Sequence, residues 1–354
     1  MRLSRFWIFA LISSTVLFGA NCSYYNKVMA RSSLVDGSAA YKARKFPDAE
    51  RLFRYAASLD PNGDSVEGRT AQLSLARTLH SMYIGKRDDK SKAEEALKEY
   101  KVSLPQTQRD LATAMGEYEK NKASEDNQRR YLNALSSVNS TTSAIASLFE
   151  NLQRPDEARQ WQMQVSADAQ MPVTARARSF SSLAAKANTC ANDISDTEAT
   201  KKTVKKDGKD VFQFSKPASE EDFAKLKQCV ADGTKSIDEA LALEPEEVKN
   251  AASVDVKKMS DIQLSLNSEI MKVFESTRSY KASLTIQAMR IAEMEGNTAE
   301  RDRLKTAGDD AKAKFTALSD TVKSIQTEID ARVAAKEEAA KGAAAANKAN
   351  ANAK

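Results

Sequence analysis

Histidine, glycine, proline and aromatic residues are all scarce in this sequence of 354 residues, which has one histidine, 11 glycines, 7 prolines and only 6% aromatic residues. The single histidine, His80, excludes a multi-histidine metal site, and any Ser-His or Cys-His mechanism would have to use it. No glycine-rich phosphate loop, H-E-x-x-H motif or C-x-x-C motif occurs. We therefore predict a protein that is not an enzyme and that holds no metal and no cofactor.

The remaining composition favours long amphipathic helices. Charged residues make up 29% of the chain, and Ala, Lys, Glu, Ser and Leu dominate it. The formal net charge is +5, and loss of Arg2 and Arg5 with an N-terminal leader leaves +3. A charge this small gives no argument for nucleic acid as a partner. We therefore predict an all-α protein that binds no nucleic acid.

The first 22 residues have the three parts of a signal peptide. A basic start over residues 1–5 precedes the apolar run 6–18, and small and polar residues follow. The apolar run is shorter than the roughly 20 residues that cross a bilayer, so a permanent transmembrane helix is the weaker alternative. No later segment is apolar enough to span a membrane. We expect an exported protein, either in the periplasm or anchored in the outer membrane.

Cys22 follows the apolar run directly and resembles the acylated cysteine of bacterial lipoproteins in its position. The match is incomplete, because Asn21 stands where these lipoproteins usually carry Gly or Ala. Ordinary cleavage, with Ala20 and Cys22 as the small residues, also agrees with the sequence. Lipidation of Cys22 and free secretion are therefore both open, and we expect a membrane contact only through such an N-terminal lipid.

Residues 30–63 carry a pattern of small and large apolar residues that is typical of two antiparallel helices. Small residues let the helices approach closely, large ones fill the space between them, and a proline stops the second helix. The residues are Gly37, Phe46, Ala49, Phe53, Ala56 and Pro61. This segment of 34 residues resembles a tetratricopeptide repeat (TPR) over its full length. The resemblance implies a solenoid of stacked helical hairpins that binds partner proteins.

Three further copies match this repeat in part. The second has a first helix near residues 69–83 and a second helix that ends before Pro105, with eight extra residues around 84–92 in the turn. The third covers residues 145–158, and the fourth is split, with its first helix near residue 183 and its second ending in residues 237–245.

These patterns divide the chain into segments. After the leader come N-terminal TPR-like repeats (23–105), a helical continuation with a degenerate repeat (106–190), an insertion (191–228), C-terminal helices joined near Gly296 (229–333), and a tail (334–354). The tail consists mainly of Ala, Lys and Asn and lacks aromatic and branched apolar residues. We predict that it is disordered.

The insertion contains the one non-helical feature that we expect. Asp207 and Gly208 lie between β-prone flanks over residues 203–214, which predicts a small β-hairpin. We interpret the lysines between positions 201 and 209 as a solvated turn, with a phosphate or lipid headgroup site as the alternative. Ser219 and Asp222 have the spacing of a capping box where the next helix begins.

Cys190 and Cys229 form the most informative pair of residues. In the TPR register, Cys190 lies at the end of the fourth copy's first helix and Cys229 near the start of its second. These two ends are neighbours in an antiparallel helix pair, and export makes an oxidising compartment the expected environment. We predict a disulfide between them, and two free buried cysteines are the alternative.

The TPR resemblance also implies a partner-binding groove lined by first-helix residues. In the first copy these residues are Arg31, Leu34, Ser38, Tyr41 and Lys42, and in the second copy they are Thr70, Leu73, Arg77, His80 and Ser81. Such a surface is mixed but basic, and it suits an extended acidic segment or a terminal carboxylate of a partner. The alternative is that these side chains are ordinary solvated groups.

The resemblance implies a protein–protein interaction scaffold of the bacterial cell envelope whose protein or peptide partner is unknown. The alternative is a surface or periplasmic substrate-capture lipoprotein that binds peptides or glycans. Aromatic side chains projecting into one pocket would favour substrate capture, whereas a long groove without them would favour the scaffold.

Overall fold

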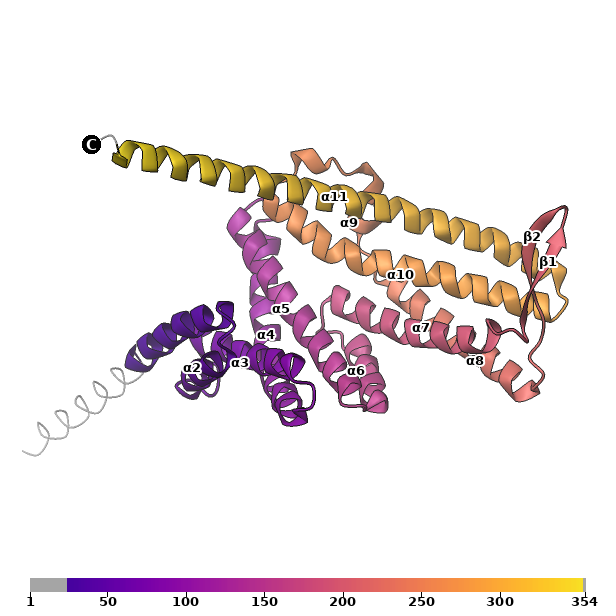
Figure 1. The fold of residues 1–354 in the computed structure, drawn as a ribbon, viewed down its shortest axis with the longest axis horizontal. Helices are drawn as coiled ribbons and strands as arrows, with labels where there is room; N and C mark the ends of the chain where they lie inside the picture. The colour runs from indigo at the N-terminus through magenta and orange to yellow at the C-terminus, as the bar shows by residue number, and fades with distance from the viewer. Residues whose placement is uncertain (1–23, 353–354) are drawn as a thin grey trace, which may run out of the picture. The chain divides into compact units, whose positions relative to one another are not determined.

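A computed structural model describes residues 24–352 of the chain (Figure 1). Helices dominate this part, and the only sheet within it has two antiparallel strands. The prediction of an all-α fold with a small β-hairpin is confirmed. No helix in this part is both long and apolar enough to cross a membrane. The predicted signal peptide and Cys22 lie outside the described residues.

The chain folds into two compact units. Unit 1 contains the residues up to Thr113 together with Ser137–Ala158, and unit 2 contains Ala114–Ser136 and Arg159–Lys354. Two long helices, α4 (Lys90–Lys120) and α5 (Glu125–Asn151), contribute residues to both units.

Unit 1 begins with the hairpin that the repeat pattern predicts. A helix over residues 24–42 is followed by α2 (Phe46–Ser58). A Cβ atom on Gly37 would lie 2.7 Å from Cε1 of Phe53, so only glycine fits at this position without a shift of the ring. Phe53 is 2% exposed, and Ala49 and Ala56 are completely buried. The small and large residues of the pattern therefore form the contact between the two helices.

The first helices of successive hairpins lie side by side in unit 1. The hydroxyl groups of Tyr41 on helix 24–42 and Ser81 on α3 (Val66–Gly85) are 2.9 Å apart. Arg77 of α3 donates a hydrogen bond of 3.1 Å to the hydroxyl of Ser140 on α5. Helix 24–42, α3 and residues 137–151 of α5 thus form one layer, which we call the first-helix layer.

The second helices of the hairpins form the other layer of unit 1. Lys92 of α4 donates to Glu50 of α2 at 3.0 Å. Arg154, which precedes α6 (Pro155–Ala167), donates to Glu94 of α4 at 3.0 Å. The second-helix layer therefore consists of α2, α4 up to Thr113 and the start of α6.

The second hairpin differs from the prediction in two respects. The eight extra residues do not make a long turn, because α3 extends to Gly85 and α4 begins at Lys90. The predicted helix end at Pro105 is wrong, because α4 continues through this residue to Lys120. Proline removes the N–H that would bond to the carbonyl of Lys101. Both residues are exposed, so water can replace that donor.

Unit 2 is built mainly on four helices. They are α7 (Val173–Ser195), α8 (Glu220–Ala242), α10 (Asp261–Met294) and α11 (Thr298–Asn352), with the short elements α9 (Glu246–Lys249), η1 (Ala251–Ser253) and η2 (Val256–Lys258) between α8 and α10. The completely buried side chains of Leu226, Leu264, Phe274, Leu284 and Ile325 contribute to its core. The predicted junction of the two long C-terminal helices near Gly296 is confirmed, because Gly296 lies between α10 and α11 with φ +74°.

A small residue again permits close packing in this unit. A Cβ atom on Gly233 of α8 would lie 2.7 Å from Leu284 of α10 and 3.0 Å from Ala187 of α7. Leu284 is completely buried and cannot easily move aside. The three helices meet at this glycine as helix 24–42 and α2 meet at Gly37.

The predicted β-hairpin is confirmed. Strand β1 (Lys201–Lys206) pairs antiparallel with β2 (Lys209–Phe214), and Asp207 and Gly208 form the turn with φ values of 50° and 77°. A two-residue turn with both φ values positive is the type I′ turn that Asp-Gly favours. Helix α8 follows, with Ser219 as its N-cap, whose hydroxyl accepts from the backbone N–H of Asp222 at 3.2 Å.

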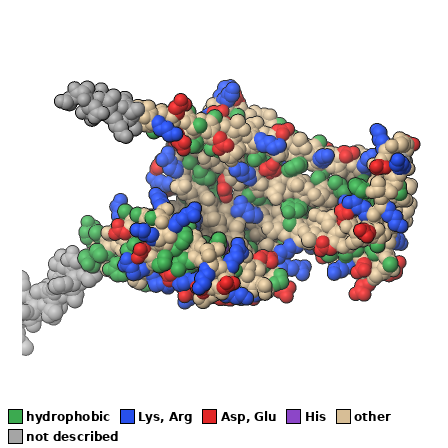
Figure 2. Space-filling view, viewed as in Figure 1, with side chains coloured by type: hydrophobic (Ala, Val, Ile, Leu, Met, Phe, Trp, Pro, Cys, Tyr) green, Lys and Arg blue, Asp and Glu red, His purple; other side chains and the backbone are tan. Residues whose placement is uncertain are grey.

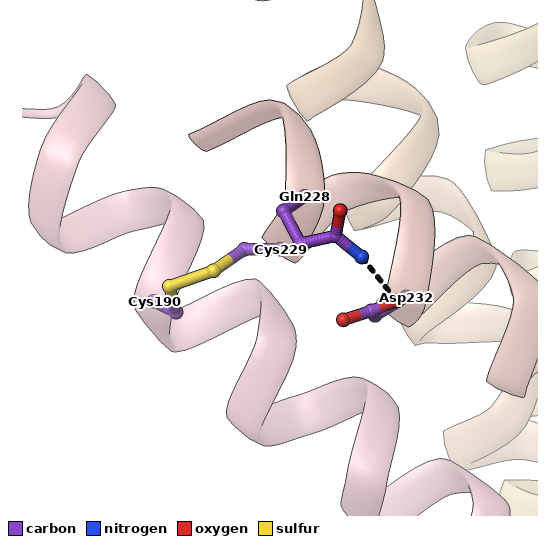
Figure 3. The surroundings of a disulfide bond; sticks show 4 residues. All are labelled: Cys190, Gln228, Cys229 and Asp232. Atoms are coloured by element: carbon purple, nitrogen blue, oxygen red, sulfur yellow. Dashed lines mark hydrogen bonds between the residues drawn. A yellow bond between two sulfur atoms is a disulfide. The ribbon is translucent and has the colours of Figure 1, made fainter. Parts of the chain in front are cut away.

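The predicted disulfide between Cys190 and Cys229 is also confirmed (Figure 3). It joins α7 to α8 with a Cα–Cα distance of 6.1 Å and a sequence separation of 39 residues. Cys229 packs against an apolar cluster that includes Leu226 and Val230. A closed loop of this length stabilises the fold by roughly 4 kcal/mol in the loop-entropy model. Such a bond indicates an oxidising compartment outside the cytoplasm.

The C-terminal segment differs from the prediction of disorder after position 333. Helix α11 continues to Asn352, and residues 334–343 are exposed. The lack of apolar residues prevents burial of this segment in a core. It does not prevent helix formation, because Ala and Lys are strong helix formers. Near the start of this segment, Lys336 forms an ion pair with Asp261 at the N-terminus of α10.

Candidate functional site

The predicted groove residues lie on the first two helices of the first-helix layer, and they differ in exposure. Leu73 is only 7% exposed and belongs to the core of unit 1. The other residues comprise the exposed side chains Arg31, Ser38, Lys42, Thr70 and Arg77 and the half-buried side chains Leu34, Tyr41, His80 and Ser81. The accessible part of this surface is therefore polar and basic, whereas Leu73 contributes to packing.

Hydrogen bonds and a ring contact fix the middle of this surface. Besides its contact with Tyr41, the hydroxyl of Ser81 donates to the backbone carbonyl of Arg77 at 2.9 Å. The ring of Tyr41 meets the ring of Phe46 edge to face, with 5.5 Å between the centroids. The aromatic residue near the turn of the first hairpin thus positions a side chain that connects two successive first helices.

Carboxylates pair with two basic side chains of the second-helix layer, Lys92 and Arg54. Lys92 and Arg54 both donate to Glu50, at 3.0 and 2.8 Å, and Arg54 also donates to Glu95 at 3.0 Å. Burial alone would raise the pKa of Glu50, but the hydrogen bonds from Arg54 and Lys92 outweigh it and lower this pKa. Both cations therefore have ionised partners in this layer.

At the first-helix layer, Arg77 of α3 and Arg87, which follows α3, donate to neutral groups on α5, whereas Arg69 of α3 pairs with Asp110 of α4. Arg77 donates to the Ser140 hydroxyl at 3.1 Å, and Arg87 donates to Oδ1 of Asn151 at 3.0 Å. Neither acceptor neutralises a positive charge. Neither Arg77 nor Arg87 is therefore paired with a carboxylate in these two hydrogen bonds.

His80 is held in a partly buried position beside Tyr100 of α4. Its Nδ1 atom is 3.4 Å from the hydroxyl of Tyr100, and the two rings are perpendicular with centroids 5.9 Å apart. Burial, and to a smaller extent the charge of Arg87, lowers the pKa of His80 below its usual value of 6.5. Burial also raises the pKa of Tyr100 to about 12. The imidazole is therefore neutral at neutral pH.

A second candidate surface is a long groove in unit 2, between α8, α10 and α11. Two cavities of about 780 and 570 Å³ make up this groove, and both are lined by Thr234, Ala288 and Leu304. No aromatic residue lines either cavity in the described structure. No sequence motif indicated this groove, and its only signal is alanine at helical spacing, such as Ala307 and Ala311 on α11.

Several charged residues in this groove form ion pairs within the chain. Arg278 donates to Glu244 at 2.8 Å, and their side chains are only 16% and 11% exposed. Lys281 donates to Asp238 at 2.6 Å. Because these charges already have partners, the middle of this groove suits an uncharged segment better than an ionic one.

A smaller polar cleft of about 230 Å³ lies between α7 and α10. Arg178 and Lys272 line it together with Ser182, Ser276 and Tyr280. Arg178 is 3.9 Å from Glu269, and Lys272 donates to Gln326 at 3.0 Å. The sequence reasoning did not find this cleft, because its members come from helices 90 residues apart and form no motif.

Comparisons with known proteins assign the chain to no family. No protein-family model matches the chain, and no curated protein is significantly similar to it in sequence. Within the part of the chain that the structure describes, no group of three or more His, Cys, Asp or Glu residues is placed to hold a metal ion.

The burial of His80 predicts how it titrates. Because the folded-state pKa lies below the unfolded-state value near 6.5, His80 contributes stability above pH 6.5 that is lost as the pH falls through the folded-state pKa. The chain has one histidine, so a proton NMR titration of its imidazole reports this pKa without ambiguity. We expect a midpoint below 6.5, and His80→Gln should flatten the dependence of unfolding free energy on pH in this range. A midpoint at or above 6.5 would contradict the burial of His80.

Proposed function

We propose that the chain is a non-enzymatic interaction scaffold of the bacterial cell envelope. In this proposal, the TPR-like first-helix layer binds an acidic segment or a terminal carboxylate of a partner protein. The side-by-side arrangement of helix 24–42, α3 and α5 carries the proposal, since the contacts Tyr41–Ser81 and Arg77–Ser140 join them. A continuous face made of first helices is the surface that a TPR solenoid uses for recognition.

The charge distribution supports an anionic partner. Arg77 and Arg87 bond to neutral groups on this layer, and Arg31 and Lys42 are exposed beside them in the repeat register. Hydrogen bonds from guanidinium groups to carboxylates are stronger than those between neutral groups. Arg77 and Arg87 would therefore form stronger hydrogen bonds with the carboxylates of an acidic partner segment than with their present neutral acceptors.

The substrate-capture alternative receives less support. It requires aromatic side chains that project into a pocket, and the long groove of unit 2 has none among its described lining residues. Tyr280 lines the small cleft between α7 and α10, but it is the only aromatic residue among the described residues lining that cleft. The scaffold therefore remains our proposal.

We also propose that the protein is exported to the periplasm or anchored in the outer membrane as a lipoprotein. The disulfide between Cys190 and Cys229 and the signal-like residues 1–22 both support export. Intact mass of the protein purified from membranes of its native host distinguishes the two forms. A diacylglyceryl group on an N-terminal Cys22 is expected for the anchored form, cleavage without lipid for the free form, and a chain that begins at Met1 contradicts export.

Charge reversal on the first-helix layer tests the binding function. The probe is a short fluorescent peptide rich in Asp and Glu with a free terminal carboxylate, and fluorescence anisotropy measures its Kd. Arg77→Glu should weaken binding at least about tenfold, because it replaces a charge-assisted hydrogen bond by repulsion. The control is Arg51→Glu on α2, since the Arg51 side chain is 72% exposed and 3.9 Å from Asp48.

The control variant should bind the peptide within about twofold of the unchanged chain, because an exposed charge on the other layer contributes little. Added salt should weaken the binding of the unchanged chain. Equal losses for the two variants, or absence of saturable binding by the unchanged chain, would contradict the proposal.

A further inference from the structure

Helix 24–42 exposes large apolar side chains at the surface of the described part of the chain. The exposed fractions are 72% for Tyr24, 60% for Tyr25, 48% for Val28 and 63% for Val35. At about 100° per residue, Tyr24, Val28 and Val35 lie within roughly 40° of one another around the helix. We call these four residues the N-terminal apolar face. In Figure 2 hydrophobic side chains gather where this first described helix begins.

Basic residues accompany this face. Lys27, Arg31 and Lys42 are all exposed, and Asp36 is the only acidic residue of the helix. Apolar side chains flanked by lysine and arginine are the pattern of helices that lie in the interface of an anionic membrane. Tyrosine is enriched at the same depth, because its ring is apolar and its hydroxyl is polar.

The position of the helix in the sequence supports a membrane as the occupant. Tyr24 is two residues after Cys22, the last residue of the segment that resembles a signal peptide. In either processed form of the chain, the N-terminal apolar face is thus close to the new N-terminus. With a lipid on Cys22, it would be held at the bilayer, and a second binding element adds to a lipid anchor.

We propose that helix 24–42 lies on an anionic lipid surface through its N-terminal apolar face, with Lys27 and Arg31 at the headgroups. This contact takes up Arg31 of the predicted groove, whereas the groove residues on α3, such as Arg77, lie on a different helix. Tyr41, which contacts Ser81 of α3, lies roughly 120° around the helix from the centre of the apolar face. The protein thereby presents its partner-binding surface beside the membrane, and the membrane contact does not depend on the function proposed above.

Flotation with lipid vesicles tests this proposal. The protein is the chain beginning at Ser23, which carries every described residue but no leader and no lipid. The vesicles contain phosphatidylcholine alone or phosphatidylcholine with phosphatidylglycerol. We expect the chain to float with the anionic vesicles, and Val28→Glu combined with Val35→Glu should lower its partition coefficient at least about tenfold.

Two further variants make the result specific. Val66→Glu is the matched control, because Val66 on α3 is 65% exposed, close to the 63% of Val35, but lies outside the N-terminal apolar face. It should float like the unchanged chain. The second variant combines Lys27→Glu with Arg31→Glu and leaves the apolar residues intact. It should lower the partition coefficient by about fivefold or more for each residue replaced. Circular dichroism checks that each variant is folded.

Three results would overturn the proposal. They are absence of flotation with anionic vesicles, an equal loss in the Val66→Glu control, and self-association through this face in place of lipid binding. Size-exclusion chromatography with light scattering detects the last, as a dimer that Val28→Glu with Val35→Glu dissolves. Arg77→Glu should leave flotation unchanged, so failure of the membrane contact and failure of the partner-binding function are distinguishable.

Discussion

The close approach of antiparallel helices at positions without a side chain is the constraint on which both units depend. Gly37 lies under the ring of Phe53 in unit 1, and Gly233 lies under Leu284 in unit 2, each at a distance that leaves no room for a Cβ atom. Both large partners are buried, with exposed fractions of 2% and 0%. Because protein interiors are densely packed, these partners have little space to move into. The helix pairs are therefore fixed at short separation.

This packing determines what the surface can present. Once each hairpin is fixed, its first helix can align with the first helix of the next, and Tyr41, Ser81, Arg77 and Ser140 connect them. Carboxylates pair with Lys92 and Arg54 in the second-helix layer, whereas Arg77 of the first-helix layer bonds to a neutral hydroxyl. The pairing of these charged groups thus follows from which residues the hairpins bring together.

The features that could be predicted from the sequence depend on local spacing or on a local motif. Gly37 with Phe53, Asp207 with Gly208, and the cysteines of two neighbouring helices all have this character, although α7 and α8 extend past the predicted helix ends at these cysteines. Pro105 misled the prediction because its missing N–H lies on an exposed side of α4, where solvent can compensate. The tail composition excluded a core but not a helix. The groove between α8, α10 and α11 and the cleft beside Arg178 could not be predicted, because residues distant in sequence form them without a shared pattern.

The free energy of unfolding of Gly37→Ala, compared with that of Gly116→Ala, tests the central constraint most directly. Both glycines lie within helices, but a Cβ atom on Gly116 would meet nothing within 4 Å. In urea titrations, Gly37→Ala should lower the free energy of unfolding by about 1–3 kcal/mol through overpacking against Phe53. Gly116→Ala should raise it by up to about 1 kcal/mol through helix propensity. Equal stabilisation by both substitutions would contradict the close approach at Gly37 and the layered stack built on it.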